Sequence, residues 1–163
     1  MRIVQASLLI VCLAWQGIAL ASKEQPSLSV ATTEGKTFDL SKQRGKWVVV
    51  NFWATWCGPC LKEMPDLDGF DQARDDVVVV GLAFEEIEAA ELKSFVKKRG
   101  VRYPIALVDV YEPPADFDVP RGLPTTYLID PDGKVAEKFL GPITSEDLAR
   151  VIATKSVPTK TET

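Results

Sequence analysis

Two continuous apolar runs stand out in the middle of the chain. Residues 47–54 and 77–84 are rich in valine and other apolar side chains and contain almost no polar ones. Runs of this length and composition predict strands that are buried on both faces. Residues 59–74 between them can form a helix, with a kink expected at Pro65. The centre of the chain therefore predicts a strand, a helix and a second strand.

Helical spacing returns after the second run. Apolar residues recur at helical intervals over residues 86–99, and Gly100 supplies a stop signal. Ser145 is a suitable cap for a last helix, which we expect to end at about residue 153. Residues 155–163 are polar and are expected to be a disordered tail.

Shorter apolar segments complete the pattern. Residues 28–40 alternate about a turn at Glu34 and Gly35, as in a small edge hairpin. Three further segments have strand length and composition: residues 103–108, 125–129 and 134–140. The turn at residues 130–133 makes the last two an antiparallel pair. This order of elements predicts an α/β fold in which a mixed central β-sheet carries helices on both faces.

The N-terminus has the layout of a secretory signal. Arg2 gives a basic start, residues 3–20 are almost wholly apolar, and Ala21 ends a small-x-small cleavage site. We therefore expect residues 1–21 to be a signal peptide and residues 22–154 to form the exported domain. An uncleaved membrane anchor remains the alternative, because the apolar stretch is just long enough for a thin or tilted span.

Composition limits the remaining possibilities. A chain of 163 residues with 46% hydrophobic residues can build one ordinary core and leaves little room for a second domain. The formal net charge is −4, and acidic and basic residues are interspersed along the chain. This charge pattern gives no indication of nucleic-acid binding, and we expect a monomer.

The candidate chemistry lies in the motif Trp56-Cys57-Gly58-Pro59-Cys60, where the first predicted strand leads into the first predicted helix. Free backbone N–H groups and the helix dipole favour the thiolate form of a cysteine at a helix N-terminus. We expect Cys57 to attack a substrate disulfide, and the more buried Cys60 to resolve the mixed disulfide. Such a cycle needs no cofactor beyond the two cysteines.

Other uses of the pair are weaker. Tetrahedral zinc needs four ligands, whereas the chain has no histidine and loses Cys12 with the signal peptide, so no metal site is expected. A purely structural disulfide is disfavoured because a two-residue spacing closes almost no chain. A Cu(I)-binding chaperone that uses the two thiolates stays open as an alternative, although Met64 is the one methionine beyond the signal.

The sequence from Gly45 to Pro65 resembles the exported TlpA/ResA-like thioredoxins, which have the CcmG-type proteins as relatives. A second matching block spans residues 122–134, and the resemblance covers roughly residues 27–153. It implies a thioredoxin-like fold and a disulfide reductase that works in an oxidising compartment. The Gly-Pro dipeptide between the cysteines is also the one found in reducing thioredoxins.

The resemblance further implies that the Leu123–Pro124 bond is cis and faces the cysteines. A proline at the start of a strand has no backbone N–H to donate to the neighbouring strand. A cis bond there turns the preceding backbone outward, where it can pair with an extended substrate segment. We therefore expect Pro124 to belong to the catalytic site. The residues expected to bind substrate are Trp56, Gly58, Pro59 and Leu123.

Glu63 lies three residues after Cys60, so helical spacing places it on nearly the same face. It could handle protons near the resolving thiol, and the resemblance to ResA-like proteins implies this catalytic role. Asn51 stands where cytosolic thioredoxins carry a buried aspartate, and an amide cannot take a proton. This difference strengthens the case that Glu63, or water, moves the proton.

Together these signals predict a thiol-disulfide oxidoreductase that reduces exported client proteins with cysteine pairs. The resemblance implies apocytochrome c or the copper-site cysteines of an oxidase as clients, and a membrane thiol-disulfide carrier as electron donor. It implies a periplasmic protein, held at the inner membrane if the N-terminal segment is retained. The loop at residues 109–121 either helps to choose clients or is a solvated linker.

Two other enzyme classes follow from the same motif. Sequence sets the direction of electron flow only weakly, so a disulfide oxidase or isomerase is the alternative. A thiol peroxidase on the same fold would need proline and threonine where Val50 and Ala54 stand, so that possibility is weak.

Overall fold

The computed structural model describes residues 23–156, so the expected signal peptide and residues 157–163 of the expected tail lie outside the described residues. No helix within residues 23–156 is long and apolar enough to cross a membrane. The elements follow in this order: β1 (Ser29–Ala31), β2 (Thr37–Asp39), the 3₁₀ helix η1 (Leu40–Gln43), β3 (Trp47–Trp53), α1 (Gly58–Ala73), β4 (Val77–Phe84), α2 (Ala89–Arg99), β5 (Ile105–Val108), β6 (Thr125–Ile129), β7 (Val135–Leu140) and α3 (Ser145–Ser156).

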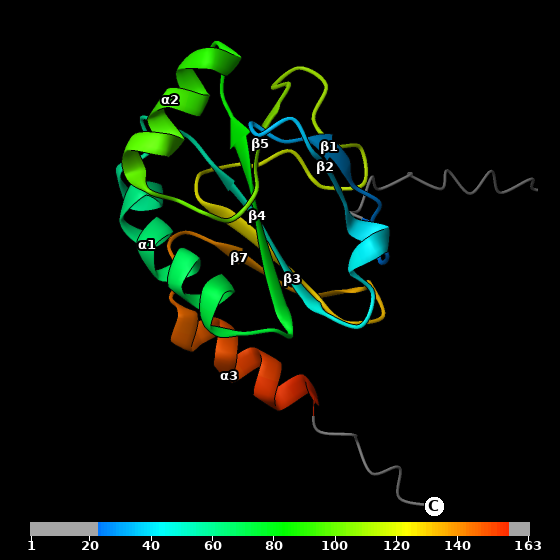
Figure 1. Ribbon diagram of the computed structural model, residues 1–163. Coiled ribbons are helices and arrows are strands. Elements are labelled where there is room, and N and C mark those ends of the chain that lie inside the picture. The colour runs from blue at the N-terminus through cyan, green and yellow to red at the C-terminus, as the bar shows by residue number, and fades with distance from the viewer. Residues whose placement is uncertain (1–22, 157–163) are drawn as a thin grey trace, which may run out of the picture.

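In the described part of the chain, the central sheet has five strands in the order β5-β4-β3-β6-β7 (Figure 1). β3, β4 and β5 run parallel, whereas β6 pairs antiparallel with β3 and β7 antiparallel with β6. The mixed α/β sheet predicted from the apolar runs is confirmed. β1 and β2 form a separate antiparallel pair, as the alternation over residues 28–40 indicated.

β3 occupies the middle of the sheet, and every one of its residues is buried. Its side chains alternate between two apolar layers, as the pleat of a strand requires. Val49 and Trp53 enter the layer that also contains the two cysteines, whereas Val50 and Phe52 enter the other layer. The central strand therefore carries the chain directly from the core into the cysteine motif.

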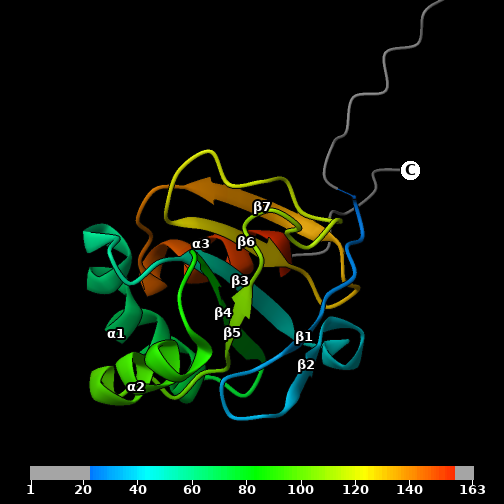
Figure 2. The ribbon, with the colours of Figure 1, turned by 90° about the horizontal axis from the view of Figure 1, so that it is seen from above.

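The three α-helices of the described residues share one face of this sheet. Figures 1 and 2 show α1, α2 and α3 on this face. Leu67 of α1, Leu92 of α2 and Leu148 of α3 all belong to the same apolar layer. The opposite layer is closed by β1, β2, η1 and the loop after β5, through residues such as Leu40 and Phe117. Helices thus lie on both faces, but the second face has only the 3₁₀ helix η1. This follows from the two successive parallel connections through α1 and α2, which return on the same side.

The ends of several elements differ from the sequence prediction. α2 begins at Ala89 rather than near Glu86, because Glu88 is still extended and acts as its N-cap. α3 continues to Ser156, so Lys155 is helical, although the disordered tail was expected to begin there. A cation in the last turn of a helix interacts favourably with the helix dipole, which is consistent with this extension. The short helix η1 was not predicted, and Asp39 caps it through Ser41 N–H.

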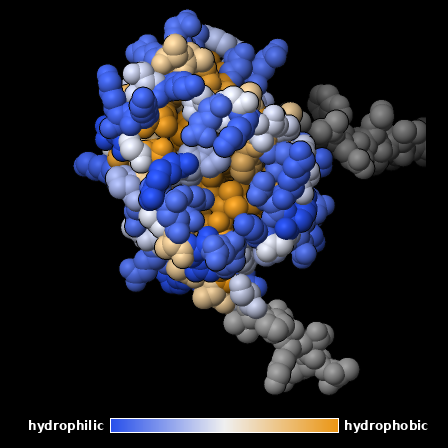
Figure 3. Space-filling view, in the orientation of Figure 1, coloured by the Kyte–Doolittle hydropathy of each residue, from blue (hydrophilic) through white to orange (hydrophobic). Residues whose placement is uncertain are grey.

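Hydrophilic side chains cover most of the surface seen in Figure 3, with apolar side chains showing between them. The large apolar residues that are most exposed in the described range are Trp56, Tyr111, Val119 and Leu140. Trp56 is the one among them that belongs to the cysteine motif.

Candidate active site

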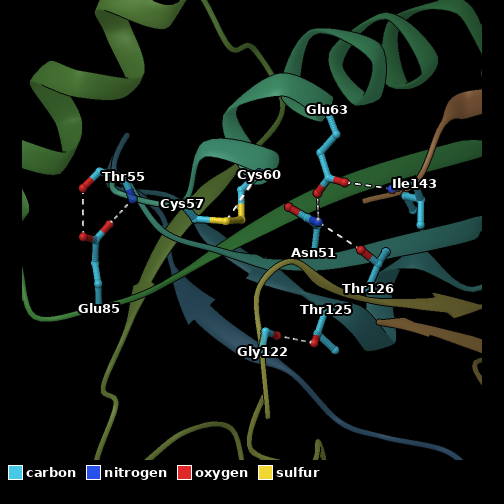
Figure 4. Close-up of a disulfide and its surroundings, with 10 residues drawn as sticks. All are labelled: Asn51, Thr55, Cys57, Cys60, Glu63, Glu85, Gly122, Thr125, Thr126 and Ile143. Carbon is cyan, nitrogen blue, oxygen red and sulfur yellow. Dashed lines mark hydrogen bonds between the residues drawn. A yellow bond between two sulfur atoms is a disulfide. The ribbon is translucent and has the colours of Figure 1, made fainter. Parts of the chain in front are cut away.

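Cys57 and Cys60 form a disulfide at the point where β3 leads into α1 (Figure 4). Their Cα atoms lie 5.3 Å apart. Cys57 is the N-cap of α1, and its Sγ accepts a hydrogen bond from the backbone N–H of Cys60 over 3.3 Å. Pro59 stands in the first turn, where its missing N–H would have had no helical partner.

The position of Cys57 has a chemical consequence for the reduced protein. The N-terminal N–H groups and dipole of α1 point at its sulfur, and this field favours a thiolate over a thiol. Cys60 is completely buried and Cys57 is 4% exposed, so both sulfurs are largely shielded in the oxidised protein. The expected difference in burial is therefore present but small.

Trp56 projects beside the disulfide with 70% of its surface exposed, whereas Trp53 is completely buried, as the sequence indicated. Trp56 and Leu123 line the same cleft, which has a volume of about 380 Å³. The Leu123–Pro124 bond is cis, and Pro124 is buried at the start of β6. The strand that follows Pro124 pairs with β3, which places this turn next to the cysteine motif. The other walls of the cleft come from Phe84 to Glu86, Val110 and Pro120 to Gly122.

Gly58 and Pro59 are exposed at the tip of the motif. One cleft opens on each side of this tip. Pro59 lines a second cleft of about 660 Å³, between the first turns of α1 and the start of α3, with Glu63 and Ile143 in its wall. The sequence-predicted binding residues are thus divided between two neighbouring clefts. Trp56 and Leu123 face one of them, and Pro59 faces the other.

Glu63 is a buried carboxyl that the protein holds in place from two sides. Its Oε1 accepts a hydrogen bond from Asn51 Nδ2 over 2.8 Å, and its Oε2 accepts one from the backbone N–H of Ile143 over 3.0 Å (Figure 4). Burial raises the pKa of this carboxyl above its ordinary value, and the two hydrogen bonds oppose that shift. A buried acid whose pKa is raised by its surroundings is a candidate for proton transfer.

Asn51 lies between the disulfide and Glu63 in Figure 4. Its Nδ2 also donates to Thr126 Oγ1 over 3.0 Å, so one amide joins α1 to both β3 and β6. The sequence placed Glu63 on the face of Cys60, and the structure adds that Asn51 connects this carboxyl to the sheet beneath the cysteines.

Glu85 is a site residue that sequence reasoning missed. It follows β4 and accepts two hydrogen bonds from Thr55, one from the backbone N–H over 2.6 Å and one from the hydroxyl over 2.8 Å (Figure 4). Glu85 therefore holds the segment that leads into Cys57. A usable signal was present, because Glu85 directly follows a predicted buried strand, and such strand ends gather site residues.

The loop at residues 109–121 is anchored in its middle. Phe117 is buried against the rings of Phe52 and Tyr127, and Asp116 accepts a hydrogen bond from the backbone N–H of Ser27 over 2.8 Å. The end of the loop, including Arg121, forms a wall of the cleft beside Trp56. The loop is thus not a simple solvated linker.

Within residues 23–156, no group of three or more His, Cys, Asp or Glu side chains is arranged to hold a metal ion. Among the residues drawn in Figure 4, the two with carboxyl side chains are Glu63 and Glu85, and each is engaged in hydrogen bonds.

The chain matches the Redoxin family over residues 20–152. It is 40% identical over 128 residues to a thiol-disulfide oxidoreductase ResA of Bacillus cereus, a match that covers 77% of this chain and 73% of that protein. Among solved structures, the thiol:disulfide interchange protein of Chlorobium tepidum TLS is similar with a TM-score of 0.69 and 30% identity, over 82% of this chain and 96% of that one. A secreted thiol-disulfide isomerase of Corynebacterium glutamicum is similar with a TM-score of 0.67 and 26% identity, over 78% and 81% of the two chains.

Proposed function

This chain belongs to the Redoxin family and is a thiol-disulfide oxidoreductase with a thioredoxin-like fold, and we propose that it uses Cys57 and Cys60 to reduce disulfides of exported client proteins. The observation that carries the proposal is the disulfide at the N-terminus of α1. Beside it lies a cleft whose wall includes Leu123, the residue that precedes the cis-proline Pro124.

The reductive cycle has two thiol-disulfide exchanges. The Cys57 thiolate attacks one sulfur of a client disulfide, a bond forms between the two, and the other client sulfur leaves as a thiolate. Cys60, after loss of its proton, then attacks Cys57 Sγ, which re-forms the Cys57–Cys60 disulfide and releases the second client thiolate. The client has gained two electrons and the pair has lost them. A donor dithiol then returns the pair to its reduced state.

The surrounding residues have separate tasks in this cycle. The cleft between Trp56 and Leu123 receives an extended client segment, with Pro124 fixing the turn beside it and Gly58 contacting the segment at the tip of the motif. Pro59 contributes the exposed rim of the neighbouring cleft. These contacts orient the client sulfur, which is the main way that positioned groups speed an exchange reaction.

Glu63 is proposed as the group that takes up and returns protons on the Cys60 side of the pair. It is buried one helical turn beyond Cys60, and the cleft that contains Pro59 opens onto it. A carboxyl there can exchange its proton with solvent while the disulfide stays covered.

We base the proposed clients and location on the resemblance to the TlpA/ResA-like proteins rather than on the geometry. We propose apocytochrome c or copper-site cysteines of an oxidase as clients, a membrane thiol-disulfide carrier as donor, and export directed by residues 1–21 to the periplasm. The similarity to a secreted thiol-disulfide isomerase is in line with export.

The test is the reduction potential of the Cys57–Cys60 pair. The full-length protein is equilibrated against glutathione or dithiothreitol buffers, and the redox state is followed by the fluorescence of Trp53 and Trp56. A potential near or below that of thioredoxin, about −270 mV, supports a reductase. A potential near about −120 mV would instead identify a disulfide-forming enzyme.

A second assay separates the proposed clients. Reduction rates are compared for oxidised peptides that contain Cys-x-x-Cys-His and for oxidised peptides with the cysteine spacing of an oxidase copper site. Faster reduction of one class by the wild-type protein, lost in Cys57→Ser, assigns the client. Equal rates with both and with an unrelated disulfide peptide would contradict client selection by the cleft.

A further inference from the structure

The carboxamide of Asn51 uses only one end in hydrogen bonds. Both N–H groups of Nδ2 are engaged, one with Glu63 Oε1 over 2.8 Å and one with Thr126 Oγ1 over 3.0 Å. The oxygen Oδ1 is buried and has no hydrogen-bond partner. Because both of these hydrogen bonds use Nδ2, the NH₂ end of the amide faces Glu63 and the oxygen faces away from it.

The direction in which Oδ1 points is toward the disulfide. Strand alternation puts Asn51 between Val49 and Trp53, on the face of β3 that contacts α1, and both of these neighbours belong to the apolar layer that contains Cys57 and Cys60. In Figure 4 the oxygen end of the Asn51 amide is directed at the cystine and its nitrogen end at Glu63. A buried acceptor without a partner is costly, so a site that retains one calls for an explanation.

The disulfide explains why Oδ1 has no partner in the oxidised protein, because a cystine has no hydrogen to donate. Reduction breaks the S–S bond and adds two electrons and two protons, which a donor dithiol supplies as it becomes a disulfide. Completely buried Cys60 then carries an S–H group, a weak donor that can give its hydrogen to a nearby acceptor.

We propose that Asn51 Oδ1 accepts a hydrogen bond from the Cys60 thiol in the reduced protein. The amide is thus a redox-specific partner: its N–H groups hold Glu63 and Thr126 in both states, and its oxygen is satisfied only after reduction. The proposal rests on the dithiol-disulfide cycle of the proposed function and adds a named contact to it.

This contact has two effects on the pair. It stabilises the dithiol relative to the disulfide, so it makes the reduction potential less negative than it would be without the amide oxygen. It also holds the proton on Cys60 while the helix N-terminus favours the thiolate on Cys57. The two cysteines therefore keep different protonation states before a client arrives, and attack by Cys60 waits until this proton has left.

The first test compares Asn51→Leu with the matched control Thr126→Val. The leucine has a similar volume and removes Oδ1 together with the Nδ2 bonds to Glu63 and Thr126. The valine removes the Thr126 hydroxyl and leaves Oδ1 in place. In glutathione buffers, loss of one hydrogen bond should shift the equilibrium about fivefold toward the disulfide in Asn51→Leu. Fivefold corresponds to a potential more negative by about 20 mV. Thr126→Val should shift it less than twofold. Equal shifts in the two variants, or none in Asn51→Leu, overturn the proposal.

The second test observes the thiol directly and does not require the Asn51 variant to fold. In the full chain with Cys12→Ser and Cys57→Ser, Cys60 is the one remaining thiol, since the sequence has three cysteines. Its S–H stretching band in the infrared should lie below that of a free alkanethiol in an apolar solvent, and Asn51→Leu in the same background should raise it. A band at the free-thiol position with native Asn51 overturns the proposal.

Both readouts are independent of client reduction. The S–H stretching band and the difference in reduction potential between variants are measured on the protein without a client. The reductase assignment depends instead on the absolute reduction potential and on the rates of client reduction. The Asn51 proposal can therefore fail while the reductase assignment holds, and the reverse is also possible.

Discussion

Glu85 Oε1 accepts the backbone N–H of Thr55 over 2.6 Å, while its Oε2 accepts the Thr55 hydroxyl over 2.8 Å. Thr55 comes two residues before Cys57, and β4, which ends just before Glu85, is the parallel neighbour of β3. The carboxylate therefore ties the segment before Cys57 to the end of the adjacent strand. A segment fixed in this way can present Cys57 in one orientation.

Glu85→Ala should reduce client reduction without removing the redox pair. Loss of the two charge-assisted hydrogen bonds is expected to lower the free energy of unfolding by about 1 to 2 kcal/mol. Misplacement of the motif should lower kcat/KM by about tenfold. Steady-state reduction of a disulfide peptide and denaturant unfolding measure the two effects. Glu91→Ala is the matched control, because Glu91 is an exposed carboxylate on α2 that does not line the cleft beside Trp56. A tenfold loss in that control as well would contradict the assignment to Glu85.

Trp56→Ala should weaken client binding. An exposed aromatic side chain in a cleft wall is typical of residues that carry binding energy, so KM is expected to rise about five- to tenfold. The unfolding free energy should change little, since Trp56 is 70% exposed. Leu140→Ala, which removes an equally exposed apolar side chain from β7, should leave KM unchanged. Equal KM values for wild type and Trp56→Ala would show that the cleft does not bind the client.

Glu63 should make stability depend on pH. Because burial raises its pKa above the ordinary 4.5, the folded protein binds the proton more tightly than the unfolded chain. Stability from this group is fully present below pH 4.5 and is lost as pH rises toward the folded pKa. Denaturant unfolding across this range should show the decline in the wild type.

The variant Glu63→Gln isolates this contribution. The glutamine side chain does not titrate, so it does not lose stability as the pH rises. The unfolding free energy of the variant relative to that of the wild type should therefore increase with pH. Glu91→Gln, at an exposed position of α2, is the control. Parallel pH curves for Glu63→Gln and wild type would contradict the raised pKa.

Gly81→Ala should destabilise the fold. Gly81 faces Asn51 across β3 and β4, and a Cβ there would lie 2.5 Å from Ile105 Cδ1 and 3.0 Å from Trp53 Nε1. Overpacking of this kind typically costs about 1 to 3 kcal/mol. Gly69→Ala is the matched control, because a Cβ at this helical position meets nothing within 4 Å and should stabilise by about 0.5 to 1 kcal/mol. Denaturant unfolding of the oxidised proteins measures both, and an unaffected Gly81→Ala would disprove the tight packing.

Local patterns were sufficient for most of the secondary structure. β4 and β6 have the predicted bounds, and β3 ends one residue earlier than expected, because continuous apolar runs and flanking turn residues are readable one segment at a time. The motif around Cys57 and Cys60 was readable for the same reason, since two cysteines two residues apart carry their chemistry in their spacing. Helix ends were less accurate, as at Ala89, because caps depend on single backbone angles.

The sequence by itself determined the α/β element order, the redox pair and the oxidoreductase class, because these depend on periodicity and spacing within short segments. Only the tertiary structure decided that three α-helices of the described residues share one face, that Glu85 holds Thr55, and that Asn51 stands between Glu63 and the disulfide. These are contacts between residues 12 or more positions apart. They depend on how strands and helices pack in space, and a buried polar atom shows its missing partner only once its neighbours are in place.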